Sequence, residues 1–446
     1  MFGASIISPG DLDGDGLSEL LVGAPEESSL FYRGGAIYLF KGSTIANAET
    51  LQAADADLII SPDDWGHRLG GNMVFDGDFD GDDIPDLLVA AKDGYMSCES
   101  GPSCLGTGQV YLFTGAQLIN STSLSTLDAT LHFSGFGASN GQNGVQTGSG
   151  LAFADFDGDG LDDIAIAASD GQTSMAEGNT YLFLNQNLPS SGTVNILDFD
   201  YRIHGSAGEY LGNDIARIND IDGDNVNDLL IGSASDCSVD AIAYVLRAVD
   251  LGANPEVTPS KTIYSSAGCS QIGYKVASTV DVDADGRNDL LVTAPKYTDD
   301  LSEQGAVFVI GSADLFSINA LDVEVEALMA FIGPAADDAL GSGFFHEIGD
   351  LNLDNQPDFL FSAHTSSFFV ANGGRAFLSL SPDYAFIRQG ALTSTHQFRP
   401  DFAQEQLGAD GLSADFNGDS LKDIALSAPG TNSFSGSVYL YFSPTE

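Results

Sequence analysis

The nine residues Asp155–Asp163 read DFDGDGLDD, with acidic side chains at positions 1, 3, 5 and 9, and the apolar run IAIAA follows them directly. Six more copies of this pattern, D-x-[DN]-x-D-x-x-x-[DE] before an apolar run, occur along the 446 residues. They are Asp11–Glu19, Asp78–Asp86, Asp220–Asp228, Asp281–Asp289, Asp350–Asp358 and Asp415–Asp423. Because a unit repeated at a regular period is the mark of a repeat architecture, this motif decides the fold.

Each copy of the acidic motif has the same neighbours. A glycine lies about eight residues before it, usually after a large apolar residue as in Phe2-Gly3, whereas the third copy has Thr147-Gly148. A strand such as LLVGAP follows the motif, then one such as GAIYLF, and then a weaker one such as DLII. Together with the strand that carries the glycine, each unit holds four short strands, which is typical of a propeller blade.

The repeat predicts an all-β, seven-bladed β-propeller of four-stranded antiparallel blades, forming one domain over residues 1–446. The expected blades cover residues 1–62, 63–135, 136–205, 206–267, 268–333, 334–400 and 401–446. A β-solenoid is the alternative, but its rungs are usually much shorter than this period. Only six of the fourth strands lie inside the sequence, because the last unit ends shortly after GSVYLYF. We therefore expect a seventh blade of three strands with an exposed edge, whose closing strand would lie before Met1.

The acidic motif has the chemistry of a calcium site. Ca²⁺ takes six to eight oxygen ligands, which carboxylates at positions 1, 3, 5 and 9 and the backbone carbonyl of position 7 can supply. The predicted ligands are Asp11, Asp13, Asp15, Leu17, Glu19, Asp78, Asp80, Asp82, Ile84, Asp86, Asp155, Asp157, Asp159, Leu161, Asp163, Asp220, Asp222, Asp224, Val226, Asp228, Asp281, Asp283, Asp285, Arg287, Asp289, Asp350, Asn352, Asp354, Gln356, Asp358, Asp415, Asn417, Asp419, Leu421 and Asp423. Two carboxylates about 4 Å apart repel by roughly 4 kcal/mol at an effective dielectric near 20, so such a cluster calls for a cation. We expect up to seven structural Ca²⁺ ions, bound more weakly where asparagine replaces aspartate at position 3.

The motif has other interpretations. A solvated turn explains one isolated copy equally well, and it is the sevenfold recurrence before matching strands that favours a metal. An EF-hand does not fit, because the last acid stands at position 9 instead of 12 and a strand follows instead of a helix. Mg²⁺ fits less well, since it prefers six ligands and keeps its waters. Position 6 often needs a positive φ, which suits glycine and asparagine, while Asp83 and Ser420 depart from that preference.

The combined pattern resembles the FG-GAP repeats of the integrin α-subunit propeller. Phe2-Gly3 and Gly23-Ala24-Pro25 match both halves of that name in the first blade, and blades four, five and seven keep close variants. The resemblance covers nearly the whole chain and implies a calcium-binding propeller. Two departures are that all seven blades carry the acidic motif, whereas integrins have it in only some, and that nothing like the integrin leg domains follows. We therefore expect a propeller of bacterial type.

The charge balance narrows the range of partners. The chain has 64 acidic and 15 basic residues, and its net charge of −49 would repel the phosphate backbone of a nucleic acid. No apolar run approaches the roughly 20 residues that span a bilayer. No secretory signal precedes the first repeat, so we expect an extracellular or cell-surface protein whose signal peptide is missing from this sequence.

The four cysteines favour an oxidising setting outside the cytoplasm. Cys98 and Cys104 lie in the loop between strands two and three of blade two, Cys237 lies in the same loop of blade four, and Cys269 stands just before blade five. Three pairings are possible. Because loops 2–3 and 4–1 leave the same face of a propeller, we favour Cys98–Cys104 and Cys237–Cys269, with four free thiols as the alternative.

The face opposite the acidic loops is the one that integrin-like propellers use for ligands. It holds the longest insertions and the only tryptophan, Trp65, which could stack on a sugar, anchor a partner or pack between blades. The G-A-S-N-G around Ser139 matches a nucleophile motif formally but lacks its strand-turn-helix context, so no catalytic residue is predicted. The first hypothesis is a non-enzymatic, extracellular, calcium-binding adhesion or recognition module with a protein ligand. The alternatives are a glycan-binding, lectin-like propeller and a polysaccharide lyase or hydrolase.

Overall fold

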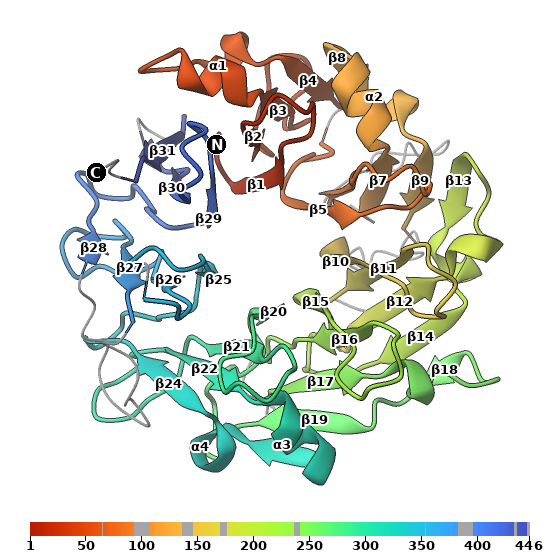
Figure 1. Cartoon of the computed structure of the whole chain (residues 1–446), viewed down its shortest axis with the longest axis vertical. Helices are drawn as coiled ribbons and strands as arrows, with labels where there is room; N and C mark the ends of the chain where they lie inside the picture. Colours follow the sequence, from red (N-terminus) through yellow and green to blue (C-terminus); the bar gives the residue numbers. More distant parts are fainter. Residues whose placement is uncertain are drawn as a thin grey trace.

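A computed structural model describes residues 1–64, 66–92, 108–135, 146–169, 176–235, 241–352, 354–381, 396–431 and 435–443. Its strands form seven sheets arranged in a ring, in the order of the sequence (Figure 1). The first strand of each blade lies nearest the centre of the ring, and the later strands follow outward (Figure 1). The predicted seven-bladed, all-β propeller is therefore confirmed, and so is the three-stranded last blade among the described residues.

Each blade is an antiparallel meander. The strands are β1 (Ser5–Gly10), β2 (Glu19–Gly23), β3 (Ile37–Phe40) and β4 (Leu58–Ser61) in blade one; β5 (Asn72–Gly77), β6 (Asp86–Ala91), β7 (Gln109–Phe113) and β9 (Leu131–Ser134) in blade two; β10 (Thr147–Ala154), β11 (Asp163–Ala168), β12 (Asn179–Phe183) and β14 (Tyr201–His204) in blade three; β15 (Ile215–Ile218), β16 (Asp228–Ile231), β17 (Ile242–Leu246) and β19 (Lys261–Tyr264) in blade four; β20 (Val276–Ser278), β21 (Leu290–Ala294), β22 (Ala306–Ile310) and β24 (Met329–Ile332) in blade five; β25 (Phe345–Glu347), β26 (Phe359–Ser362), β27 (Ala376–Ser379) and β28 (His396–Phe398) in blade six; and β29 (Gly411–Ala414), β30 (Asp423–Ala428) and β31 (Ser437–Tyr441) in blade seven.

The middle strands are apolar along their whole length because neighbouring blades cover both of their faces. Every residue of β11 is buried, and in its ladder Ile166 lies opposite Leu151 on one side and Tyr181 on the other. A strand that is half exposed would alternate apolar and polar residues, whereas a strand buried on both faces reads as a continuous apolar run.

Four blades have a fifth strand, which differs from the four strands expected. The strands β8 (Ser123–Ser125), β13 (Gly192–Asn195), β18 (Glu256–Val257) and β23 (Ala320–Asp322) each run parallel to the fourth strand of the preceding blade. Each of them comes from the connection between the third and fourth strands of its own blade. These connections therefore tie consecutive blades together at the rim. Their two to four residues are too short to stand out in the sequence as strands.

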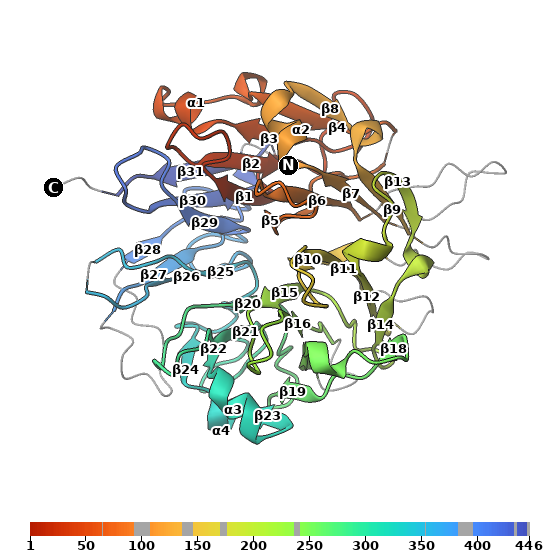
Figure 2. The same ribbon diagram turned by 45° about the vertical axis from the view of Figure 1, so that its right-hand side comes forward.

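The remaining elements are single helical turns in the same outer connections. They are α1 (Gly42–Ala46), η1 (Ala53–Asp55), α2 (Gly115–Asn120), η2 (Thr126–Asp128), η3 (Asn185–Asn187), η4 (Ile196–Asp198), η5 (Ala248–Asp250), α3 (Ser312–Ser317) and α4 (Val323–Glu326). Figure 2 shows several of them along the outer rim of the ring. In the described part of the chain, no helix has the length and apolarity that a membrane crossing would need.

The core consists of apolar layers between adjacent blades. The layer between blades seven and one contains Ile6 and Val22 on one side and Leu412 and Phe416 on the other. The backbone N–H of Ile6 also donates to the Asp410 carboxylate of blade seven at 2.8 Å. Side-chain packing and hydrogen bonds therefore close the ring between its first and last blades.

The glycine of the repeat has a conformational role. Gly212 has φ +80°, and a Cβ atom there would lie 2.6 Å from the Cβ of Ala167. All seven equivalent glycines have a positive φ; they are Gly3, Gly70, Gly148, Gly212, Gly273, Gly341 and Gly408. A side chain at this position would be strained by the backbone, which explains why a glycine precedes every acidic motif.

Candidate metal centre

All seven acidic motifs form the loop between the first and second strands of a blade. Loop one, for example, joins β1 to β2 at Asp11–Glu19, and loop four joins β15 to β16 at Asp220–Asp228. Because every blade runs in the same direction, these loops leave the same face of the ring. We call them loops one to seven and number their positions 1 to 9.

Position 1 organises the turn through its carboxylate. In loop three, Asp155 accepts the backbone N–H groups of Gly158 at 2.7 Å and Gly160 at 3.0 Å. The carboxylate of position 5 accepts the N–H of position 7, as Asp159 does from Leu161 at 2.9 Å. These bonds fold the loop so that its acidic side chains converge.

Position 6 has a positive φ in all seven loops, including those where the sequence offers no glycine or asparagine. Asp83 has φ +63° and Ser420 has φ +68°, close to the +65° of Asn225. The turn geometry therefore does not depend on residue type at this position. The two departures from the expected residue types carry some backbone strain, because a non-glycine residue is disfavoured in this region.

Position 9 holds each loop to the rest of its blade. Asp228 accepts the N–H of Ile221 through one carboxylate oxygen and that of Ala248 through the other, both at 3.0 Å. The same pair of bonds, from position 2 and from the residue two places after the third strand, recurs in every blade: at Glu19, Asp86, Asp163, Asp228, Asp289, Asp358 and Asp423. These acids are at most 1% exposed. These two bonds fix the position-9 carboxylate in place within its blade.

Burial makes these position-9 acids hard to ionise without a cation. It raises the pKa of Asp86, Asp163 and Asp228 to about 7 and that of Asp289 to about 6, with neighbouring loop carboxylates adding to the shift. The pKa values of the remaining position-9 acids are also raised by burial. A carboxylate with so raised a pKa is stabilised in its charged form by a nearby positive ion.

Position 3 has a partner that the sequence analysis did not identify. Lys41 Nζ lies 2.8 Å from one carboxylate oxygen of Asp13, Gln186 donates to Asp157 at 2.6 Å, and Arg247 lies 3.4 Å from Asp222. Each partner comes from the segment just after the third strand of the same blade. No shared signal marks these partners in the sequence, because their residue types differ and they follow the third strand at two different distances.

In two loops, one carboxylate oxygen of the position-3 acid pairs with a basic side chain, and the environment of the other oxygen shows whether a cation would fit. In loops one and four, Asp13 Oδ1 and Asp222 Oδ1 are buried and accept no hydrogen bond from any residue that the structure describes. A buried carboxylate oxygen without a partner is costly, so these atoms are expected to have a ligand. The donor set fits a hard cation that prefers oxygen, as Ca²⁺ does.

Five loops bring three carboxylates together, with one oxygen of each within 4.8 Å of the others. The groups are Asp11, Asp13 and Asp15; Asp78, Asp80 and Asp86; Asp155, Asp157 and Asp163; Asp220, Asp222 and Asp228; and Asp281, Asp283 and Asp285. Loops six and seven have asparagine at position 3. The Asn417 amide donates to Asp419 at 3.1 Å, and the Asn352 amide donates to the backbone carbonyl of Ser381. The Asn417 bond lies within loop seven, whereas the Asn352 bond joins loop six to the segment after the third strand. The weaker Ca²⁺ binding expected in these two loops stays a prediction.

Neighbouring loops are coupled through position 8. The Asp162 carboxylate of loop three accepts the backbone N–H of Asp78 in loop two at 2.9 Å, and Asn227 of loop four does the same for Asp155 at 3.2 Å. A change of shape in one loop therefore reaches the first ligand position of the preceding loop.

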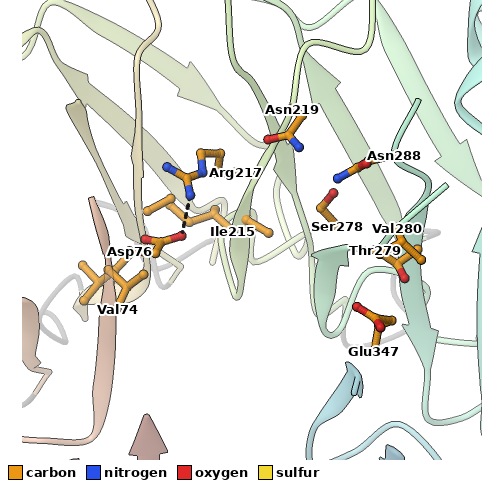
Figure 3. A pocket seen from close by; sticks show the side chains of 13 residues that line it. Val74, Asp76, Ile215, Arg217, Asn219, Ser278, Thr279, Val280, Asn288 and Glu347 are labelled. Atoms are coloured by element: carbon orange, nitrogen blue, oxygen red, sulfur yellow. Dashed lines mark ion pairs between the residues drawn. The ribbon is translucent and has the colours of Figure 1, made fainter. Parts of the chain in front are cut away.

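A cavity of about 420 Å³ opens among the first strands, next to these loops. Figure 3 shows Arg217 on its wall, with Asp76 as its ion-pair partner at 3.3 Å. Arg217 also lies 3.8 Å from Asp162 of loop three. Asn219, Asn288 and Glu347 line the same cavity, which makes this part of the ring polar.

Several residues that the sequence analysis assigned to the opposite face lie outside the described part of the chain. They are Trp65, Cys98, Cys104, Ser139 and Cys237. The remaining cysteine, Cys269, is not a free thiol. The proposed disulfide pairing and the role of Trp65 stay predictions.

Comparisons with protein families and with known proteins find similarity to FG-GAP repeats and to integrin α subunits. A family model described as FG-GAP repeat matches residues 3–40, 147–182, 272–310 and 407–441. Integrin alpha-4 of Xenopus laevis is 26% identical over 205 residues, which are 45% of this chain and 18% of that protein. Integrin alpha-PS5 of Drosophila melanogaster is 31% identical over 170 residues, 37% of this chain and 15% of that protein. The chain thus spans a small part of the length of these relatives.

The solved structure of BBS1N in complex with ARL6DN covers 100% of this chain and 93% of that one, with a TM-score of 0.50 and 9% identity. At that identity the likeness concerns the fold alone.

Proposed function

Because the chain is an FG-GAP, integrin-α-like β-propeller, we propose that it is an extracellular, calcium-stabilised recognition module of the adhesion type. Its acidic loops bind Ca²⁺ as a structural ion, and its ligand binds on the opposite face without being chemically changed. The similarity to integrin α subunits supports the adhesion role, and it also supports a place at the cell surface.

The structural role of Ca²⁺ is supported by the position of the loops. Each predicted ion would lie beside a position-9 acid that already joins the loop to the third-strand segment. An ion there would relieve the repulsion among three carboxylates and fix the turn between the first two strands. We expect EDTA to lower the melting temperature of the purified chain substantially and added Ca²⁺ to restore it. An unchanged melting curve in EDTA would refute the calcium assignment.

The observation that supports a ligand-binding site on the face opposite the acidic loops is the presence of three exposed aromatic side chains. Tyr32 is 69% exposed between β2 and β3, Phe368 is 59% exposed between β26 and β27, and Phe402 is 64% exposed between β28 and β29. All three lie in 2–3 or 4–1 connections, which leave the face opposite the acidic loops. Exposed aromatic residues are over-represented among the residues that dominate protein interfaces.

Blade six contributes the most developed part of this surface. The rings of Phe368 and Phe369 meet edge to face at 4.9 Å. Below them Arg375, which is 2% exposed, stacks on Phe368 at 4.5 Å and pairs with the buried Asp338. Arg399 lies over Phe369 at 4.6 Å. Aromatic rings held rigidly by cations are suited to binding, because little side-chain entropy remains to be lost.

The test is binding in Ca²⁺ buffer to arrays of immobilised extracellular proteins and glycans, with the Phe368→Ala variant beside the parent chain. Val325→Ala is a matched control, because Val325 is 74% exposed in α4, between the third and fourth strands of blade five and not in a 2–3 or 4–1 connection. Binding to a protein that Phe368→Ala weakens and Val325→Ala does not would support the proposal. Release of reducing sugar or unsaturated product from a polysaccharide would overturn its non-enzymatic part.

A further inference from the structure

The residue at position 8 of an acidic loop can contact the loop of the preceding blade. In loop three, the backbone N–H of Asp162 donates to the carbonyl of Asp78 at 3.4 Å, and the Asp162 carboxylate accepts the N–H of Asp78 at 2.9 Å. In loop four, Asn227 makes the same two bonds with Asp155, at 3.1 and 3.2 Å. Asp78 and Asp155 are the position-1 acids of loops two and three. We call this two-bond contact the position-8 clamp, and it holds both peptide groups that flank the acid.

Position 8 lies between two predicted ligands of its own loop. In loop three these are the backbone carbonyl of Leu161 at position 7 and the carboxylate of Asp163 at position 9. Residues 157–160 are exposed, whereas Asp163 is fully buried. Coordination through positions 7 and 9 therefore orders both neighbours of Asp162. Once its neighbours are ordered, Asp162 loses little further conformational entropy when it holds Asp78.

Arg217 joins the same three blades from inside the ring. It stands in β15, just before loop four, and its guanidinium group lies 3.3 Å from the carboxylate of Asp76 and 3.8 Å from that of Asp162 (Figure 3). Asp76 stands near the end of β5, just before loop two. The two ion pairs thus connect the strands that enter loops two and four with position 8 of loop three.

The position-8 clamp is confined to part of the ring. Position 8 is proline in loops two and six, at Pro85 and Pro357, and proline has no N–H to donate. Ser18 of loop one donates its N–H to loop seven at 2.9 Å, which is one of the two bonds. Among the residues that the structure describes, Asn288 of loop five makes neither bond with Asp220 of loop four. In the described part of the chain, complete clamps therefore join loops two, three and four.

On the basis of the proposed Ca²⁺ binding, we propose that Asp162 and Asn227 are positioning residues for the ion site of the preceding loop, so that loops two, three and four bind Ca²⁺ as one cooperative unit. The acid that Asp162 holds is the one that folds loop two, because Asp78 accepts the N–H groups of Gly81 and Asp83 at 2.7 and 2.9 Å. With loop three ordered, loop two has less conformational entropy to lose when it takes up its own ion. Coupling of this kind gives positive cooperativity without a large change of shape.

Direct repulsion between ions in neighbouring loops opposes this coupling. Salt weakens the repulsion, because exposed charges are screened over about 8 Å at an ionic strength of about 0.15 M. The backbone bonds of the clamp are between neutral groups on at least one side and depend less on salt. The coupling is therefore best measured at that ionic strength or above it.

The test is hydrogen exchange of the full chain at graded free Ca²⁺ concentrations, read by mass spectrometry, which follows peptides of loops two and three separately. Asp157→Ala removes a position-3 ligand from loop three and leaves its clamp residue in place. We expect the Ca²⁺ concentration that gives half of the protection of loop two to rise by about fivefold or more, within the range typical of coupled sites. Asp80→Ala in loop two should shift loop three by the same factor, because such coupling is reciprocal. The matched change in loop five, Asp283→Ala, should leave loop two unchanged.

Variants at position 8 separate the clamp from the general stability of the fold. Asp162→Pro removes both bonds of the clamp, and proline already stands at this position in two other loops. In the Asp162→Pro background, Asp157→Ala should shift loop two by less than about twofold, since the coupled part of the effect is lost. Asp162→Asn keeps both bonds, as Asn227 makes them in loop four, and should keep the coupling. Asn288→Pro, at position 8 of loop five, should also keep it.

The outcomes distinguish this proposal from the calcium binding on which it rests. If both loops gain protection with Ca²⁺ but neither responds to the ligand variant of the other, the coupling is overturned and the calcium binding stands. A coupling that Asp162→Pro leaves unchanged would overturn the role of position 8. No protection of either loop at any Ca²⁺ concentration would overturn both proposals.

Discussion

Replacing Asp228 by asparagine separates the two roles that position 9 has in loop four. The parent carboxylate is fully buried and accepts N–H groups from Ile221 and Ala248, both at 3.0 Å. It is also one of the three acids that converge in this loop, with Asp220 and Asp222. Asparagine keeps the size of the side chain but has one acceptor atom and no charge.

The magnitude follows from the two states of the loop. Without Ca²⁺, burial raises the pKa of Asp228 from 3.8 to about 7, a shift of about 3 units that corresponds to about 4 kcal/mol against the charged form. Asparagine removes this cost but leaves one backbone donor facing an amide, at about 1–3 kcal/mol. The difference of the two effects leaves the variant about 1–3 kcal/mol more stable than the parent in EDTA at pH 7.5. With Ca²⁺ at 100 times the dissociation constant, a site contributes about 2.7 kcal/mol, which the variant loses.

Urea unfolding of both proteins, in EDTA and in saturating Ca²⁺, measures all four free energies. Because the predicted sites are several, calorimetric titration should in addition show one Ca²⁺ fewer bound by Asp228→Asn. Equal destabilisation of the variant in EDTA and in Ca²⁺, with unchanged stoichiometry, would show that position 9 only joins the loop to the third-strand segment. The reasoning that this acid is a metal ligand would then be wrong.

Three further changes have defined outcomes. Ala284 stands at position 4 of loop five with φ +63°, where five other described loops have glycine, so Ala284→Gly should stabilise the protein by up to about 1 kcal/mol in urea unfolding; a lower midpoint would contradict the backbone argument. Gly212→Ala should cost about 3 kcal/mol, from its φ of +80° and the 2.6 Å approach to Ala167, and a loss below 1 kcal/mol would show that the site relaxes. In EDTA the pKa values of Asp86, Asp163 and Asp228 are near 7 in the folded protein and near 3.9 in the unfolded chain. The folded protein therefore binds more protons between about pH 4 and 7, and its stability falls as the pH rises through that window. A higher urea midpoint at pH 7.5 than at pH 5 would contradict this sign.

The sequence predicted the four-stranded unit that repeats and missed the contacts by which neighbouring units are joined. The seven acidic motifs, their flanking strands and the open last blade are all visible as a period, because each depends on residue types that recur at fixed offsets. The parallel fifth strands are not visible, since β18 has two residues and its pairing with β14 depends on how two blades meet. Short segments of differing sequence make these pairings, so their recurrence cannot be recognised before the blades are placed side by side.

The position-3 anchors show the same limit at the site. Lys41, Gln186 and Arg247 perform one task with three residue types and at two different offsets from the third strand, so no shared motif marks them. The motif itself distinguished the loops only by the residue types at positions 3 and 6. Side-chain contacts distinguish the loops further: an ammonium or guanidinium group pairs with one oxygen of the position-3 carboxylate in loops one and four. The position-3 amide donates to the segment after the third strand in loop six and to a carboxylate of the same loop in loop seven.

Blade seven combines a loop for which weaker Ca²⁺ binding is expected with a sheet of three described strands. Loop seven has Asn417 in place of an acid, and blade seven has three described strands, with Val438 and Leu440 half-buried. In a repeat fold each unit is stabilised mainly by its own contacts and by its two neighbours, so a unit with fewer of both opens first. Hydrogen exchange in Ca²⁺ should therefore be faster in β30 and β31 than in β11 and β12, although both pairs are regular antiparallel ladders. EDTA should reduce this difference, because it removes more stabilisation from blades with three converging acids than from blade seven. Equal protection of the two ladders in Ca²⁺ would show that the packing of blade seven against blade one compensates for the open edge.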